Sequence, residues 1–450
     1  MPIIPMEQGL YGLCRKEMDR DGFMPGYKGE VNAEIFAAHR LFRLQNTVRY
    51  ACENSPWYRA VFDKAGVKPE DIRKISDLEK LPFTTPEDIS AGGYKFLCMS
   101  QSGVEKPVTF VSTGTTGPQK RIFFSYSDVD ALTDFLGVGM RTVAPEGSAV
   151  QILLPDSAVR SMGKLLCEGV AKQGLRGYSM GVMRPSEEQV EETIENRPYV
   201  WFGDARTIYR ITKETENKYD LGKLGVKVMF TTVSEVAPSM RRYLEKVWNC
   251  RVVTHYGLTE MGFGLAVDCP DGCGYHYNEF GVIAELVDPT TGEVITDGRE
   301  GELVYTSLGR QAMPIIRYRS HDISTLKKAP CRCGAQLDTI GHVARRMEAV
   351  LTVNGESVYP TMFDDLMFSN GHVVDYDTYF DEKGTRLVFV MECIGQPKGY
   401  AERVREIMAE HPAIKGKMNP PIVYAVGSGA LKQTAQFKKL IRSVSELEKL

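Results

Sequence analysis

Strand-like and helix-like segments alternate in the middle of this 450-residue chain, and this alternation constrains its fold more than any other feature. Between residues 126 and 256, short apolar runs are separated by longer segments whose apolar residues have helical spacing. Such alternation is typical of a mainly parallel α/β sheet. The pattern predicts strands over 148–154, 176–182, 198–202, 226–231 and 251–254, and helices over 127–142, 160–173, 186–195, 204–218 and 237–247.

The segments on either side of this region have different patterns. Residues 32–65 are predicted to be helical with an interruption at Pro56, and 108–111 and 121–124 to form a strand–loop–strand hairpin. Short β segments with turns fill 262–360. The tail is predicted to contain strands over 349–353, 373–380, 386–394 and 421–425, and helices over 398–410 and 436–448. We therefore predict a large N-terminal α/β domain, residues 1–345, with mainly parallel sheets plus a β subdomain, and a small α+β C-terminal domain, residues 346–450.

Charge and hydropathy exclude several classes of protein. The 55 Lys and Arg residues nearly balance the 58 Asp and Glu residues, 55 − 58 = −3, which gives no support for a nucleic-acid-binding surface or a polybasic membrane patch. No apolar run approaches the roughly 18 residues of a membrane span. The first 21 residues are too charged for a signal peptide. We expect a cytoplasmic protein.

Ten cysteines are present, and four of them form two tight pairs. Cys269 and Cys273 lie just before His276, and Cys331 and Cys333 follow about 55 residues later. In a cytoplasmic protein, such pairs favour metal binding over disulfides. Four thiolates and one imidazole exceed the four ligands of a closed tetrahedral site, so one of the five is spare.

A Gly/Thr-rich loop joins the two strands of the predicted hairpin. It reads Ser112, Thr113, Gly114, Thr115, Thr116, Gly117, Pro118, Gln119 and Lys120. Glycines let backbone N–H groups converge on an anion, and hydroxyl groups and lysine supply further donors. The loop lacks the spacing of a Walker loop and is followed by a strand. We predict that it binds phosphate; the alternative is an ordinary flexible hairpin loop.

Two further motifs lie at predicted strand ends, where ligands bind in α/β sheets. The segment from His255 to Glu260 combines an aromatic face, a hydroxyl and a carboxylate. Tyr256 can stack on a purine and Glu260 can hold Mg²⁺. The second motif leads to Asp322, whose carboxylate can accept two hydrogen bonds from ribose hydroxyls. A strand-terminating turn and a surface salt bridge between Asp322 and Arg319 are the respective alternatives.

In this order the three motifs resemble those of the adenylate-forming superfamily of acyl-CoA synthetases, and in particular the phenylacetate–CoA ligase branch. The segment from Met313 to Arg319 adds to the resemblance, which runs from about residue 30 to the C-terminus. It implies a large α/β domain with a small C-terminal lid. It also implies ATP-dependent joining of a small carboxylic acid, aryl or arylacetic, to the co-substrate CoA through an acyl-adenylate, with Mg²⁺ as cofactor.

The resemblance also implies roles for individual residues. The loop from Ser112 to Gly117 and Lys120 hold the ATP phosphates, and Thr259 touches the α-phosphate. The remaining assignments are Glu235, Tyr256 and Gly257 for the adenine, Asp322 and the nearby Arg346 for the ribose, Glu260 for Mg²⁺, Glu348 for the hinge, and Trp201, Phe202, Gly203, His255, Gly262 and Phe263 for the acyl pocket. For the aromatic residues of this pocket, an apolar core is an equally good explanation.

Some relatives in this branch bind a structural zinc ion through a Cys, a His and a later Cys-x-Cys. The matching positions are Cys269, His276, Cys331 and Cys333, with Cys273 as the spare residue or an alternative to His276. Reduced thiols without a metal are the other alternative.

Two segments depart from the family's pattern. The usual Arg-Thr-Gly-Asp around the ribose carboxylate is Arg319, Ser320, His321 and Asp322 here. At the position of the lid lysine the chain has Phe437, followed by Lys438. Either Lys438 substitutes for that lysine through a shift of one residue, or the catalytic lysine is absent.

Three functions follow as hypotheses. The first is a carboxylate–CoA ligase. The second, motivated by the unusual lid, is adenylyl transfer to a coenzyme or other acceptor without CoA. The third is a degenerate nucleotide-binding protein without turnover. The oligomeric state stays open, with a homodimer as one alternative.

Overall fold

The computed structural model describes residues 4–110, 120–233, 235–343, 345–347, 350–431 and 441–445. The chain forms two compact units. Unit 1 comprises Met1–Gly147, Lys164–Arg176 and His255–Ala344, and unit 2 comprises Ser148–Gly163, Gly177–Thr254 and Arg345–Leu450. The last segment of unit 2 begins at Arg345, next to the predicted domain boundary. Because the C-terminal segment shares this unit with Gly177–Thr254, the division into domains at residue 345 stays a prediction.

Unit 2 contains the parallel strands that the alternating pattern predicts. They are β3 (Ala149–Leu153), β4 (Arg176–Ser179), β5 (Val200–Asp204), β6 (Val228–Thr232) and the part of β7 (Arg251–Tyr256) up to Thr254. The strand order is β7-β6-β5-β3-β4, and the pairs β3–β5, β5–β6 and β6–β7 are parallel. Every residue of β3, β5 and β6 is buried, as in strands covered on both faces.

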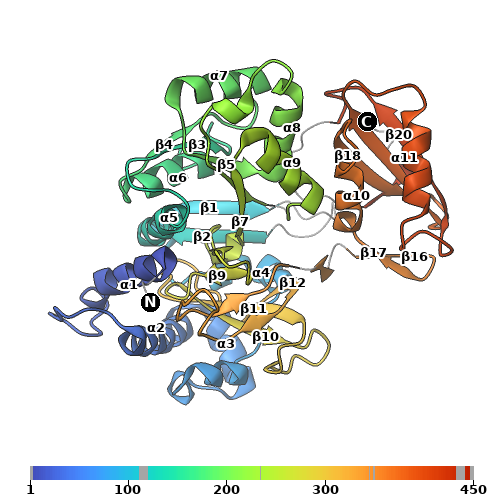
Figure 1. Cartoon of the computed structure of the whole chain (residues 1–450). Helices are drawn as coiled ribbons and strands as arrows, with labels where there is room; N and C mark the ends of the chain where they lie inside the picture. Colours follow the sequence, from blue (N-terminus) through green and yellow to red (C-terminus); the bar gives the residue numbers. More distant parts are fainter. Residues whose placement is uncertain are drawn as a thin grey trace. The chain divides into compact units, whose positions relative to one another are not determined.

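The helices that alternate with these strands are also confirmed (Figure 1). They are α6 (Met162–Ala171), α7 (Ser186–Asn196), α8 (Ala205–Thr215) and α9 (Pro238–Trp248). The start of α8 has a clear local cause. The carboxylate of Asp204 accepts hydrogen bonds from the backbone N–H groups of Arg206 at 3.1 Å and Thr207 at 3.0 Å. Such an N-cap satisfies donors that the first helical turn leaves unpaired.

The C-terminal part of unit 2 is an α+β segment, as predicted. Its elements are β16 (Leu351–Val353), β17 (Glu356–Val358), α10 (Asp364–Phe368), β18 (Val373–Phe380), β19 (Arg386–Cys393), α11 (Tyr400–Ala409), β20 (Asn419–Val426) and β21 (Arg442–Ser443). The strand order is β20-β19-β18-β21. The predicted helix over 436–448 is wrong at 442–443, because these residues pair in parallel with Tyr379 and Phe380 at the edge of β18.

Buried ion pairs and a common apolar core join α8 to this C-terminal segment within unit 2. Trp201 and Tyr209 belong to the same core as Phe389. The guanidinium of Arg206 donates to Asp364 at 2.6 Å and to Asp375 at 2.9 Å. Further along α8, Arg210 forms an ion pair with Glu392, which is fully buried. The predicted lid segment thus packs closely on α8.

Unit 1 begins with helices and a hairpin. They are α1 (Pro5–Met18), α2 (Ala33–Asn54), α3 (Pro56–Ala65), α4 (Pro86–Gly92), β1 (Val104–Phe110), β2 (Lys120–Ser125) and α5 (Tyr126–Arg141). The predicted interruption at Pro56 and the antiparallel hairpin β1–β2 are both confirmed. A reciprocal capping box between Ser125 and Asp128 starts α5 directly after β2.

Apart from Lys164–Arg176, which contains most of α6, the rest of unit 1 is the predicted β subdomain. Its strands are β8 (Ala266–Asp268), β9 (Tyr275–Tyr277), β10 (Val282–Val287), β11 (Gly301–Ser307), β12 (Tyr318–Ser324), β13 (Leu326–Lys327) and β14 (Thr339–Ile340). β10, β11 and β12 pair antiparallel, as do β8, β9, β14 and β13. Among the helices in the described ranges, none is long and apolar enough to cross a membrane.

Candidate nucleotide and metal sites

The turn after β7 presents the predicted adenine and magnesium residues. Tyr256 ends the strand, and a short 3-10 helix, η6 (Thr259–Met261), follows. A Cβ atom at Gly257 would lie 2.0 Å from the carbonyl oxygen of Phe263, so only glycine fits there. The backbone N–H of Phe263 donates to the carbonyl oxygen of Leu258 at 2.9 Å, which closes the turn.

A short hydrogen bond connects this turn to the predicted ribose-binding carboxylate. The hydroxyl of Tyr256 donates to Oδ2 of Asp322 at 2.6 Å, although the two residues are 66 positions apart. Asp322 is fully buried in β12. The surface salt bridge that was the alternative interpretation does not form. Arg319 instead donates to Glu302 on the neighbouring strand β11.

The backbone explains how the chain accommodates histidine where the family has glycine. His321 has φ = 60°, in the left-handed region that glycine enters freely and other residues enter at a cost. Its N–H donates to Oε1 of Glu302 at 3.0 Å, and the hydroxyl of Ser320 donates to the carbonyl oxygen of Leu303 at 2.7 Å. This local irregularity in the β11–β12 pairing places Asp322 despite the changed sequence.

The predicted magnesium ligand lies in a cluster of polar side chains. Glu260 is 5% exposed, and its Oε1 atom accepts hydrogen bonds from Nζ of Lys120 and, at 2.8 Å, from the hydroxyl of Tyr318. Burial opposes the charge of Glu260, but Lys120 and the hydrogen bonds outweigh burial and hold the pKa of this carboxyl below its ordinary value. The site therefore presents a carboxylate, as Mg²⁺ requires.

Sequence reasoning missed two residues of this cluster, namely Tyr318, whose contact is given above, and Arg310. Its guanidinium donates to the backbone carbonyl oxygen of Glu260 at 2.5 Å and lies 4.8 Å from the ring centroid of Phe124. Arg310 is 8% exposed, and no carboxylate of a described residue lies within ion-pairing distance. No local pattern distinguishes this arginine from a surface one, because both of its partners come from distant strands and turns.

Several predicted site residues cannot be placed beside Tyr256 and Glu260. The phosphate loop Ser112–Gly117, the hinge residue Glu348 and Lys438 lie outside the described residues. Glu235 and Arg346 are described but belong to unit 2, whereas the Tyr256 and Glu260 turn belongs to unit 1. Their roles, and that of Thr259 in η6, stay predictions.

The predicted acyl-pocket residues fall into two groups. Trp201 is fully buried in unit 2, where its indole N–H donates to Thr193 at 3.1 Å and its ring packs on Trp248 at 4.7 Å. These contacts are those of a core residue. Phe202, also in β5, packs edge-on against Phe230. Gly203 lies so close to β3 that a Cβ would come within 2.8 Å of the Leu153 side chain. The polar neighbours Asp204 and Arg206 form the helix cap and the ion pairs described above.

The second group surrounds the turn in unit 1. The ring of Phe263 stacks on Phe124 with centroids 5.7 Å apart. Gly262 is left-handed, with φ = 95°, next to Arg310. Burial lowers the pKa of His255 to about 4, so its imidazole is neutral at pH 7. Aromatic faces and a neutral imidazole suit an apolar, planar group.

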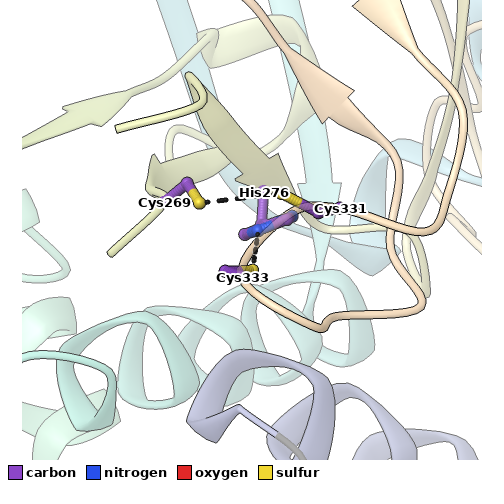
Figure 2. Close-up of side chains that lie close together, drawn as sticks. All are labelled: Cys269, His276, Cys331 and Cys333. Atoms are coloured by element: carbon purple, nitrogen blue, oxygen red, sulfur yellow. Dashed lines mark hydrogen bonds between the residues drawn. The ribbon is translucent and has the colours of Figure 1, made fainter. Parts of the chain in front are cut away.

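The four predicted zinc ligands come together in unit 1 (Figure 2). The ligand atoms of Cys269, His276, Cys331 and Cys333 all lie within 4.8 Å of one another. The Sγ atoms of Cys269 and Cys331 are 3.8 Å apart, and Nε2 of His276 is 3.2 Å from Sγ of Cys333. Ligands of tetrahedral zinc lie about 3.5–3.8 Å from each other at the usual bond lengths. The donor set and its spacing fit zinc.

Hydrogen bonds prepare His276 to act as a ligand. Its Nδ1 atom lies 3.2 Å from the carbonyl oxygen of Asp338, so Nδ1 carries the proton and the lone pair of Nε2 faces Cys333. Burial lowers the pKa of His276, which favours the neutral ring that metals bind. Cys273 is not among the four; its thiol donates to the carbonyl oxygen of Asp271 at 4.0 Å.

Comparisons with known proteins agree with this geometry. Residues 108–313 match the family described as AMP-binding enzyme. The chain is 29% identical over 346 residues to a phenylacetate–coenzyme A ligase of Aromatoleum evansii, covering 76% of this chain and 77% of that protein. It is 28% identical over 348 residues to a ligase of the same name from Pseudomonas putida, covering 74% and 76%.

Solved structures show the same fold. A 2-hydroxyisobutyryl-CoA ligase in the postadenylation state matches with a TM-score of 0.78 at 18% identity, covering 93% of this chain and 92% of that one. A benzoate CoA ligase from Burkholderia xenovorans matches with a TM-score of 0.51 at 16% identity, covering 71% and 65%. The predicted architecture, an α/β fold of adenylate-forming ligases, is confirmed.

Proposed function

We propose that this chain, an adenylate-forming enzyme similar to the phenylacetate–CoA ligases, joins an aryl or arylacetic acid to CoA with ATP. In the first half-reaction the carboxylate attacks the α-phosphate, forming an acyl-adenylate and releasing pyrophosphate. In the second, the CoA thiol attacks the acyl carbon, the bond to AMP breaks, and the thioester and AMP are released. One observation carries the proposal: three motifs that are separate in the sequence contact one another. Tyr256 donates a hydrogen bond to Asp322, and Lys120 forms an ion pair with Glu260.

The side chains of unit 1 would do the following work. Lys120 would move its ammonium from Glu260 to the polyphosphate, and Tyr256 would pack against the adenine while its hydroxyl orients Asp322 toward the ribose. Mg²⁺ is commonly bound by one or two carboxylates together with substrate phosphates, and a buried, ionised Glu260 fits that pattern. When bound, the cation would offset negative charge on the phosphates. Most of the rate acceleration would come from alignment of the carboxylate and from charge stabilisation.

The more specific part of the proposal is that the substrate acid is aromatic. It is supported by the stacked rings of Phe263 and Phe124 beside the neutral His255. The names of the two ligases reported above point the same way. We further propose a structural zinc ion held by Cys269 and its three partners, since four protein ligands leave no open position for substrate.

One experiment tests the function. The full chain is incubated with ATP, Mg²⁺ and a panel of aryl and alkyl acids, with and without CoA, and pyrophosphate, AMP and thioester are followed. The proposal predicts acid-dependent pyrophosphate release and CoA-dependent thioester, fastest with aryl or arylacetic acids. Pyrophosphate release without any thioester would instead support adenylyl transfer to another acceptor. No pyrophosphate with any acid would refute both.

A further inference from the structure

One tyrosine contacts both charged groups of the nucleotide site. Tyr318 begins β12 and is 2% exposed. Its hydroxyl donates to Oε1 of Glu260 at 2.8 Å and accepts a hydrogen bond from Nζ of Lys120 at 3.2 Å. Lys120 also donates to the same oxygen of Glu260. The three groups thus form a closed triangle.

The two atoms of the Glu260 carboxylate are therefore unequal. Oε1 accepts two donors from other residues, whereas no other residue of the described chain donates to Oε2. A carboxylate whose rotation is fixed by bonds to one oxygen presents the other in a defined direction. A single oxygen in a fixed direction is what a cation with strict octahedral geometry needs from a protein ligand.

The backbone around Tyr318 is firmly held, which suits a positioning role. The N–H of Arg319 donates to the carbonyl oxygen of Thr84 at 2.9 Å, and the N–H of Thr84 donates to the carbonyl oxygen of Arg317 at 3.0 Å. The guanidinium of Arg317 donates to Glu285 at 3.1 Å and to the carbonyl oxygen of Leu81 at 2.7 Å. The hydroxyl of Tyr318 is thus attached to a fixed point of unit 1.

We propose that Tyr318 is a positioning residue that holds Oε1 of Glu260 and leaves Oε2 as the atom that takes the divalent cation. The inference rests on the proposed function, which gives Glu260 and Lys120 their roles. Lys120 cannot keep the carboxylate in place during turnover, because polyphosphate attracts the ammonium away. A neutral phenol has no such competing attraction, so its bond to Glu260 persists when nucleotide binds. Arg310 fixes the backbone of the same residue, because its guanidinium donates a hydrogen bond to the carbonyl oxygen of Glu260.

The test replaces Tyr318 by phenylalanine in the full chain. The affinity for Mn²⁺ is measured by electron paramagnetic resonance in the presence of α,β-methylene ATP, which cannot release pyrophosphate. A hydrogen bond to a charged group is lost, so the dissociation constant for Mn²⁺ should rise about tenfold. The half-saturating Mg²⁺ concentration for pyrophosphate release should rise in parallel.

A purely structural role would change none of these quantities in a folded variant. Tyr400→Phe is the matched control, since Tyr400 is a buried tyrosine of α11 in unit 2, and it should leave Mn²⁺ affinity unchanged. In a Glu260→Gln background, Tyr318→Phe should add no further loss. Should Tyr318→Phe fail to fold, Glu260→Asp draws the carboxylate away from the hydroxyl and should weaken Mn²⁺ binding similarly.

Unchanged Mn²⁺ affinity in folded Tyr318→Phe, or in Glu260→Asp where that variant replaces it, overturns the inference. The proposed function fails in a different way: the wild-type chain would then release no pyrophosphate with any acid. The two failures are distinguished by the wild-type control alone.

Discussion

Replacing one predicted zinc ligand, Cys331→Ser, should destabilise unit 1 strongly. The loop after this cysteine inserts Ala335 and Leu337, both 0% exposed, into the same core as Leu10 of α1. Losing one of four ligands should weaken zinc binding about a hundredfold, which is the upper end of the loss caused by removing a residue that only hydrogen-bonds a ligand. A bound metal stabilises the fold by RT ln(1 + [Zn]/Kd). A hundredfold rise in Kd therefore lowers the free energy of unfolding by about 2.7 kcal/mol. For a unit of this size, Tm should fall by about 5–10 °C.

The assay combines metal analysis by mass spectrometry with thermal unfolding followed by fluorescence. The matched control is Cys273→Ser, since this thiol lies in the same loop region but outside the set of four. We expect one zinc per wild-type chain and nearly unchanged Tm in Cys273→Ser. The reasoning is refuted if chain purified without chelator holds no zinc, or if the two serine variants lower Tm equally.

Four further outcomes are expected. Glu260→Ala should abolish most pyrophosphate release while circular dichroism stays native, because a metal contact is lost at the end of a turn. Glu392→Gln should lower the free energy of unfolding by about 3 kcal/mol in urea titrations, because buried Arg210 would lose its nearest counter-charge and keep only the longer ion pairs to Glu214 at 3.6 Å and Asp375 at 3.8 Å. Burial depresses the pKa of His255 to about 4, so the unfolded chain binds more protons between pH 4 and pH 6.5. Stability should fall as pH drops through that window, and less so in His255→Gln. Lys438→Ala should suppress pyrophosphate release but spare thioester formation from pre-made acyl-adenylate if that lysine serves adenylation.

The sequence predicted the fold well where local patterns determine structure. The alternating strands and helices between residues 126 and 256 were found close to their predicted bounds, because buried parallel strands and capped helices leave clear signals. The error at 442–443 has a different origin. The segment 436–448 has helical spacing of apolar residues, but pairing with the open edge of β18 determined the conformation of Arg442 and Ser443. Tertiary pairing of that kind leaves no local signal.

The same distinction between local signals and tertiary contacts applies to the candidate site. The zinc ligands were predicted from spacing and resemblance, and the structure brings four of the five candidates together. Tyr318 and Arg310 were not predicted, because their roles depend on partners that are 58 and 50 positions away. The acyl-pocket role of Trp201 stays a prediction: an aromatic residue at a strand end suggests a pocket, and in the structure its side chain is buried and packs on Trp248. A single sequence does not separate these two uses of an aromatic side chain.

The pairing of Lys120 with Glu260 has a consequence for how the nucleotide and its cation bind. A buried carboxylate without a partner costs several kcal/mol, so Lys120 stabilises the empty site by neutralising Glu260. A polyphosphate that draws Lys120 away leaves Glu260 uncompensated, and a cation that binds Glu260 repels the nearby ammonium. Under the proposed function, ATP together with Mg²⁺ would satisfy both groups at once, since the phosphates would bind the lysine and the cation would bind the carboxylate. The ion pair would therefore couple the two ligands energetically, and reciprocity would require each to strengthen binding of the other.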